Sequence, residues 1–126
     1  MAEIMVPEFF QRFPMERVTS SSLDDKLAEA GRDLVTVLFL WGRDCPNCDI
    51  AKREILDAAG RLRWPQVRWL HDNVYDDFDL ANRFGLHGIP VFLVFKGHRL
   101  RGRITSWPGV DAFADAITRQ IEGRGG

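Results

Sequence analysis

The fold of this chain is decided by the stretch from Leu34 to Cys48, which reads LVTVLFLWGRDCPNC. Its first eight residues are apolar on both alternating faces and partly β-branched, which is typical of a strand buried on both sides. Pro46 follows at a position suited to the first turn of a helix. Apolar residues then recur at helical spacing, so we expect a helix from Pro46 to about Arg63. The stretch therefore predicts a buried strand that leads into a helix.

Helices and strands alternate along the rest of the chain. From residue 23 onwards we expect the order α, β, α, β, α, β, β, α, in which the last two strands form a hairpin before the final helix. This order predicts the α/β fold class, with a mixed sheet between helices. The other expected helices cover residues 9–13, 23–30 (with Ser22 as N-cap), 79–84 and 110–121. The other expected strands cover residues 67–70, 91–95 and 99–105, with an extra strand near Val18 left open.

Length and charge exclude several classes of protein. The chain has 126 residues, which suits one domain over residues 1–126, with an N-terminal extension at about 1–17 and a frayed tail at 122–126. The net charge of −1 lacks the basic excess expected of a nucleic-acid binder. No secretory leader is visible, and the longest apolar stretch is too short to span a membrane. We therefore expect a cytoplasmic protein without nucleic-acid or membrane partners.

The chain has two cysteines, Cys45 and Cys48, at the expected start of a helix. They are too few and too close together for a disulfide scaffold. At a helix N-terminus, unpaired N–H groups and the helix dipole lower the pKa of the first thiol below about 8.5. A thiolate on Cys45 would attack a substrate disulfide, and Cys48 would then resolve the mixed disulfide. The spacing therefore predicts a redox motif.

Two simpler interpretations of the cysteine pair remain: a chance pair of thiols, or half of a zinc site. Zinc generally needs four ligands, and the histidines that could complete the set are His71, His87 and His98. None of them lies at a recognisable ligand spacing. We therefore expect neither a metal nor a cofactor.

Two separated motifs resemble the thioredoxin family. One is the strand-Trp-x-x-x-Cys-x-x-Cys-helix pattern from Val37 to Leu56. The other is FGLHGIPVFLVFKG, from Phe84 to Gly97, which is similar to the family's segment around its cis-proline. The resemblance covers about residues 18–121. It implies a thioredoxin-like fold, with a central mixed sheet flanked by helices on both faces.

The resemblance also implies a function and a site. It implies a monomeric thiol–disulfide oxidoreductase that acts on protein disulfides and receives electrons from a thioredoxin-reductase-type donor. Pro90 would follow a cis peptide bond and face the cysteines, Ile89 would offer backbone hydrogen bonds to substrate, and Trp41 would pack beneath the active site. The implied catalytic residues are Cys45 and Cys48. The implied substrate-binding residues are Trp41, Pro46, Asn47, Ile89 and Pro90.

The residues around the cysteines depart from the family pattern. Pro46 and Asn47 stand between the cysteines where thioredoxins usually have Gly-Pro. Asp44 and Asp49 are acids that raise the pKa of a neighbouring thiol, whereas Arg43 and the helix terminus act in the opposite direction. These opposing effects leave the redox direction open.

Phe39 occupies the position of the family's buried acid, which is thought to accept a proton from the resolving thiol. A general base would then be water, Asp44, Asp72 or His71. The departures support an alternative function, a thioredoxin-fold adaptor or assembly factor that binds a protein partner with little redox turnover.

Overall fold

The computed structural model describes residues 5–123. Residues 1–4 of the expected extension and 124–126 of the expected tail lie outside this range. The elements, in chain order, are α1 (Met5–Arg12), β1 (Glu16–Arg17), α2 (Leu23–Ala28), β2 (Val35–Trp41), α3 (Pro46–Asp57), α4 (Ala59–Leu62), β3 (Val67–Asn73), α5 (Asp79–Arg83), β4 (Val91–Lys96), β5 (Arg99–Thr105) and α6 (Val110–Ile121).

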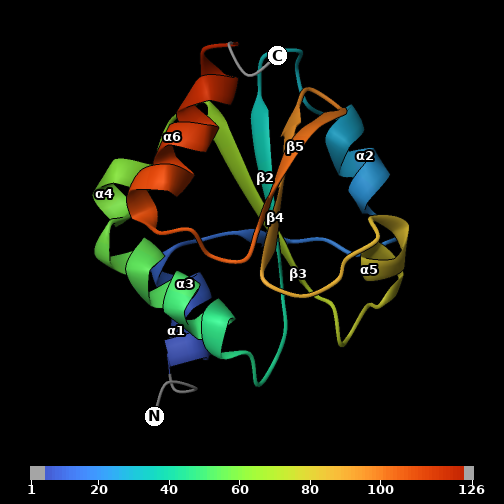
Figure 1. Cartoon of the computed structure of the whole chain (residues 1–126). Helices are drawn as coiled ribbons and strands as arrows, with labels where there is room; N and C mark the ends of the chain where they lie inside the picture. The colour runs from blue at the N-terminus through green and yellow to red at the C-terminus, as the bar shows by residue number, and fades with distance from the viewer. Residues whose placement is uncertain (1–4, 124–126) are drawn as a thin grey trace.

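The five strands form one mixed sheet in the order β1-β3-β2-β4-β5. β1, β3 and β2 run parallel, whereas β4 is antiparallel to β2 and β5 is antiparallel to β4. Helices α1, α3, α4 and α6 lie on one side of the sheet, and α2 and α5 lie on the other (Figure 1). The predicted α/β class, with a mixed sheet between helices, is confirmed.

All seven residues of the central strand β2 are buried. Alternate side chains point to opposite faces of a strand. Val35, Val37 and Phe39 therefore join the core beneath α1, α3 and α6, whereas Leu38 and Leu40 join the core beneath α2 and α5. Both hydrophobic cores thus meet on the strand that the sequence singled out. In the part of the chain described here, no helix is both long and apolar enough to cross a bilayer.

β3 is three residues longer than predicted. His71, Asp72 and Asn73 pair in register with Phe39, Leu40 and Trp41 of β2. Their polar side chains gave no strand signal. Pairing with the buried strand β2 provides hydrogen bonds for the backbone groups of these three residues. This tertiary pairing overrides the local sequence pattern.

The predicted helix over 46–63 is two helices. Ala58 leaves the helical region at φ −107° and ψ 19°, and the chain resumes as the single turn of α4. Gly60 in that turn lowers its helix propensity. α2 is also shorter than predicted and ends at Ala28, while its N-cap Ser22 makes no side-chain bond to the helix, because its hydroxyl accepts the Thr19 N–H instead.

In the sequence of β5, Leu100, Gly102 and Ile104 alternate with charged or polar residues, which predicts one covered face, but β5 follows this alternation only in part. The pairing with β4 shifts between Val94 and Phe95, so that Val94 pairs with Gly102 and Phe95 with Leu100. This irregularity places an extra residue on β5 and breaks the period of two. Leu100 is consequently 42% exposed, although the alternation predicted it on the covered face.

Replacing Phe9 tests whether α1 is part of the hydrophobic core. Its ring is fully buried and lies 6.1 Å from the ring of Phe39, centroid to centroid. We expect Phe9→Ala to lower the free energy of unfolding by about 3–5 kcal/mol, because it leaves a cavity between α1 and the sheet. Urea denaturation measures this loss. Gln11→Ala, at an exposed position of the same helix, is the control and should change stability little; equal effects would show that α1 is not anchored in the core.

Candidate active site

Cys45 and Cys48 lie where β2 passes into α3. Cys45 is the N-cap of α3 and has extended backbone angles, φ −120° and ψ 98°, and Pro46 is the first helical residue. Cys48 lies in the first turn of the helix. The two cysteines form a disulfide across a Cα–Cα distance of 5.2 Å. Cys45 is 8% exposed and Cys48 is fully buried, so substrate can approach the disulfide only from the side of Cys45.

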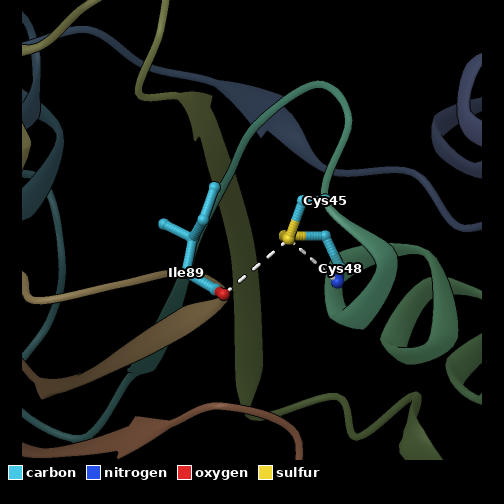
Figure 2. Close-up of a disulfide and its surroundings, with 3 residues drawn as sticks. All are labelled: Cys45, Cys48 and Ile89. Carbon is cyan, nitrogen blue, oxygen red and sulfur yellow. Dashed lines mark hydrogen bonds between the residues drawn. A yellow bond between two sulfur atoms is a disulfide. The ribbon is translucent and has the colours of Figure 1, made fainter.

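The sulfur of Cys45 lies between a helix N–H and a loop carbonyl (Figure 2). The backbone N–H of Cys48 donates to Cys45 Sγ over 3.1 Å, and the carbonyl oxygen of Ile89 lies 3.7 Å from the same sulfur. The N–H would stabilise negative charge on Cys45 after reduction. A thiol at this position could instead donate to the Ile89 carbonyl oxygen.

The Ile89 loop is brought to the cysteines by strand pairing. β4 runs antiparallel to β2 with Leu40 opposite Val91, so the beginning of β4 lies beside the end of β2. Pro90 directly precedes β4, and its peptide bond with Ile89 is cis, the form that the sequence resemblance implies. Cys45 and Ile89, which are 44 positions apart in sequence, therefore meet at one end of these two strands.

The other residues expected to bind substrate differ in exposure. Pro46 and Asn47 are exposed at the start of α3, Ile89 is partly exposed, and Pro90 is buried. Trp41 is 9% exposed and belongs to the same hydrophobic cluster as the two cysteines. The structure thus brings all the predicted site residues together around the disulfide, and Trp41 packs in the same buried cluster as the two cysteines.

Tyr75 and Gly42 are part of the site, although the sequence analysis did not identify them. A Cβ on Gly42 would lie 2.5 Å from Tyr75 Cε2 and 2.8 Å from Ile89 Cδ1, so a larger residue at this position would displace these side chains. The ring of Tyr75 is 55% exposed, and the guanidinium of Arg43 lies 5.7 Å from its centroid. Arg43 is held by an ion pair with Asp76 at 2.9 Å. These contacts join the loops after β2 and β3, which sequence spacing does not reveal.

A second group that the sequence analysis missed is Lys52 of α3, one helical turn after Cys48. Its side chain is 1% exposed, and Nζ lies 3.7 Å from the centroid of the Trp41 ring. Trp41 Nε1 donates to Nδ1 of His71 over 3.1 Å, and the ring of Phe10 stacks on His71 at 3.8 Å. Burial is the main cause that lowers the pKa of Lys52 to about 8 and that of His71 to about 4.

The three side chains considered as a general base are His71, Asp72 and Asp44. None of them provides an ionised carboxylate in the core next to the cysteines. His71 is neutral at pH 7, and its Nδ1 is occupied by Trp41. Asp72 lies on the opposite face of β3 from His71, because adjacent side chains of a strand alternate. Asp44 is exposed in the loop, with φ 55°. The position of Phe39 is apolar, and its ring stacks on Phe92 at 4.8 Å.

Metal ligation was also considered for this site. Within residues 5–123, no three side chains of His, Cys, Asp or Glu are grouped so that they could hold a metal ion. Both cysteine sulfurs are engaged in the disulfide.

The protein has the fold of thioredoxins. It superimposes on a mutant thioredoxin from Halobacterium salinarum NRC-1 with a TM-score of 0.71 and 17% identity, covering 87% of this chain and 93% of the other. It superimposes on Fasciola hepatica thioredoxin with a TM-score of 0.72 and 18% identity, covering 84% of this chain and 99% of the other. At these identities the likeness establishes the fold alone. No protein-family model and no curated protein sequence matches the chain.

Asp72 gives the fold a pH dependence of predictable sign. Its side chain is fully buried, and burial together with Asp77 raises its pKa from 3.8 to about 7. The folded state therefore holds a proton that the unfolded chain releases above about pH 4, so this group's contribution to stability falls as pH rises from 4 to 7. Relative to Asp72→Asn, the wild type should lose up to about 1.4 kcal/mol per pH unit in this window.

The measurement is the free energy of unfolding in urea at half-unit pH steps. Asp76→Asn, at an exposed neighbouring position, is the control and should follow the wild-type pH dependence. Parallel curves for wild type and Asp72→Asn would contradict the assignment.

Proposed function

We propose that this protein is a thiol–disulfide oxidoreductase that reduces disulfides of other proteins through Cys45 and Cys48. The observation that carries the proposal is the disulfide at the N-terminus of α3, with one sulfur near the surface and the other fully buried. A bridge that closes so short a loop contributes little to stability by constraining the unfolded chain. Redox exchange is the chemistry that this placement supports best.

The difference in exposure supports different roles for the two sulfurs. Cys45 is the more exposed, and its sulfur accepts the Cys48 N–H at the helix terminus, so it is the attacking nucleophile. Cys48 has no solvent exposure and can react only with the Sγ of Cys45 once Cys45 carries the substrate, so it is the resolving thiol.

The cycle transfers two electrons. In the reduced protein, the Cys45 thiolate attacks a substrate disulfide; a Cys45–substrate disulfide forms, the substrate disulfide breaks, and the leaving sulfur takes up a proton. The Cys48 thiolate then attacks Cys45 Sγ, the intramolecular disulfide forms, and the second substrate sulfur leaves and is protonated. The substrate disulfide has been reduced to two thiols. A thioredoxin-reductase-type donor would reduce the protein disulfide again.

The surface around Cys45 is suited to an extended substrate segment. The Ile89 carbonyl faces the cysteine sulfur, and Tyr75, at 55% exposure, places its ring beside Gly42 and Ile89. Phe78, at 60% exposure, adds apolar area further along the loop after β3. Backbone hydrogen bonds to Ile89 would align the substrate, and the aromatic rings would contact its side chains. We propose that the protein acts in this way as a monomer in the cytoplasm.

The same two exposed rings also favour a second candidate function, an adaptor that binds a protein partner without redox turnover. An exposed apolar surface can serve recognition alone. The adaptor function requires that partner binding survive the removal of both cysteines, whereas the oxidoreductase function requires that turnover depend on each of them.

Replacing each cysteine separately tests the proposed cycle. Cys45→Ser should abolish reduction of insulin disulfides by dithiothreitol-driven turnover, because the nucleophile is lost. Cys48→Ser should form a mixed disulfide that persists, because nothing resolves it. Insulin precipitation measures turnover, and mass spectrometry of the intact protein measures the mixed disulfide.

Gln11→Ala, at an exposed position of α1, is the control and should retain wild-type turnover. Wild-type protein that fails to turn over with chemical and enzymatic reductants would exclude the oxidoreductase function. Retained partner binding by the double cysteine variant would then support the adaptor.

A further inference from the structure

Lys52 is buried without a hydrogen-bond partner. Its side chain is 1% exposed, and Nζ makes no hydrogen bond in the described part of the chain. The groups around Nζ are aromatic: the Trp41 centroid lies at 3.7 Å and the Phe10 centroid at 5.4 Å. Aromatic faces attract a cation, but they do not replace the hydrogen bonds that an ammonium group makes in water. The arrangement is therefore costly unless an anion forms nearby.

Lys52 retains its positive charge at neutral pH. Burial lowers its pKa to about 8, and the carboxylate of Asp49 acts in the opposite direction. A group with this pKa is mostly protonated at pH 7. The core beneath the disulfide consequently holds an ammonium group.

Within residues 5–123, the elements packed around Lys52 supply no ionised side chain that faces it other than Asp49. His71 of β3 is neutral because burial lowers its pKa to about 4. α1 contributes the ring of Phe10, while its charged residues Glu8 and Arg12 are exposed. β2 contributes the uncharged ring of Trp41. The charged group that acts on Lys52 is therefore Asp49, on the same helix.

Cys48 is the group on this helix that can become an anion in the core. It lies four residues before Lys52, on the same face of α3, and both side chains are buried. Side chains four residues apart on a helix are neighbours, with Cβ atoms about 6 Å apart. Helical side chains also lean towards the N-terminus, which directs Lys52 to the turn that carries Cys48.

We propose that Lys52 is a positioning residue of the redox centre, whose buried ammonium group stabilises the thiolate of Cys48 during the resolving step. The inference rests on the proposed function, and it supplies a charge that stabilises the Cys48 thiolate in a site where Phe39 stands in place of an acid. In this step the Cys48 thiol gives its proton to water, and the thiolate attacks Cys45 Sγ. The Cys45–Cys48 bond forms, the Cys45–substrate bond breaks, and the substrate sulfur leaves and takes a proton from water. Lys52 remains protonated throughout.

Titration of Cys48 tests this inference. In the Cys45→Ser background, Cys48 is the lone thiol, and its ionisation is followed by the ultraviolet absorbance of the thiolate between pH 6 and 11. Adding Lys52→Met, which keeps the length of the side chain and removes its charge, should lower the thiolate fraction at a given pH at least about tenfold, which is one pKa unit.

Lys26→Met in the same background is the matched control. It removes one positive charge on α2, on the other side of the sheet, and should change the thiolate fraction less than about twofold. An unchanged Cys48 titration in Lys52→Met would overturn the inference, as would equal shifts in both variants. A purely structural role for Lys52 would change stability without moving the thiol titration.

A second measurement uses the unaltered chain and so does not depend on the folding of a variant. The titration of Lys52, followed by NMR of the carbon and protons next to Nζ, should move to higher pH when the disulfide is reduced, since a thiolate then forms beside the ammonium group. An identical titration in the oxidised and reduced protein contradicts the inference.

The outcomes separate the two proposals. Absence of insulin reduction by the wild type would exclude the proposed function, and the titrations of Cys48 and Lys52 could still be measured. Normal insulin reduction with no shift in either titration would exclude the role of Lys52 alone.

Discussion

The structure depends on the burial of β2 along its whole length. A strand that is covered on both faces must pair on both edges, because its backbone groups have no access to water. β3 and β4 meet this requirement, and each then presents its own side chains to the two cores. The helices are placed by the same constraint, since one group covers the face of Val37 and Phe39 and the other covers the face of Leu38 and Leu40.

The position of the site follows from where this strand ends. β2 delivers Cys45 to the N-terminus of α3, and the antiparallel pairing with β4 delivers Ile89 and Pro90 to the same edge. The disulfide therefore lies between a helix terminus, which favours negative charge, and a carbonyl, which can accept a hydrogen bond. Trp41 belongs to the same buried cluster as the two cysteines, and the ammonium group of Lys52 lies over its ring.

Much of this arrangement could be predicted from local patterns. The β2 stretch, Pro46 at the helix start and the spacing of Cys45 and Cys48 have short-range signals, because strand burial, helix entry and thiol geometry each depend on adjacent residues. The extension of β3 over His71, Asp72 and Asn73 had no such signal, since its cause is a ladder with β2. The bulge in β5 had no such signal for the same reason, because it depends on the pairing with β4.

The sequence by itself determined the fold class, the buried strand and the identity of the reactive pair, because apolar period and residue spacing are local properties. Only the tertiary structure decided which groups surround that pair. Lys52 looks like an ordinary helical lysine in the sequence, and Tyr75 like an ordinary loop tyrosine. Lys52 lies over the ring of Trp41, and Tyr75 lies in the space beside Gly42. Both environments exist only after the sheet has formed. Burial and charge proximity are properties of the folded chain, and they set the chemistry of the site.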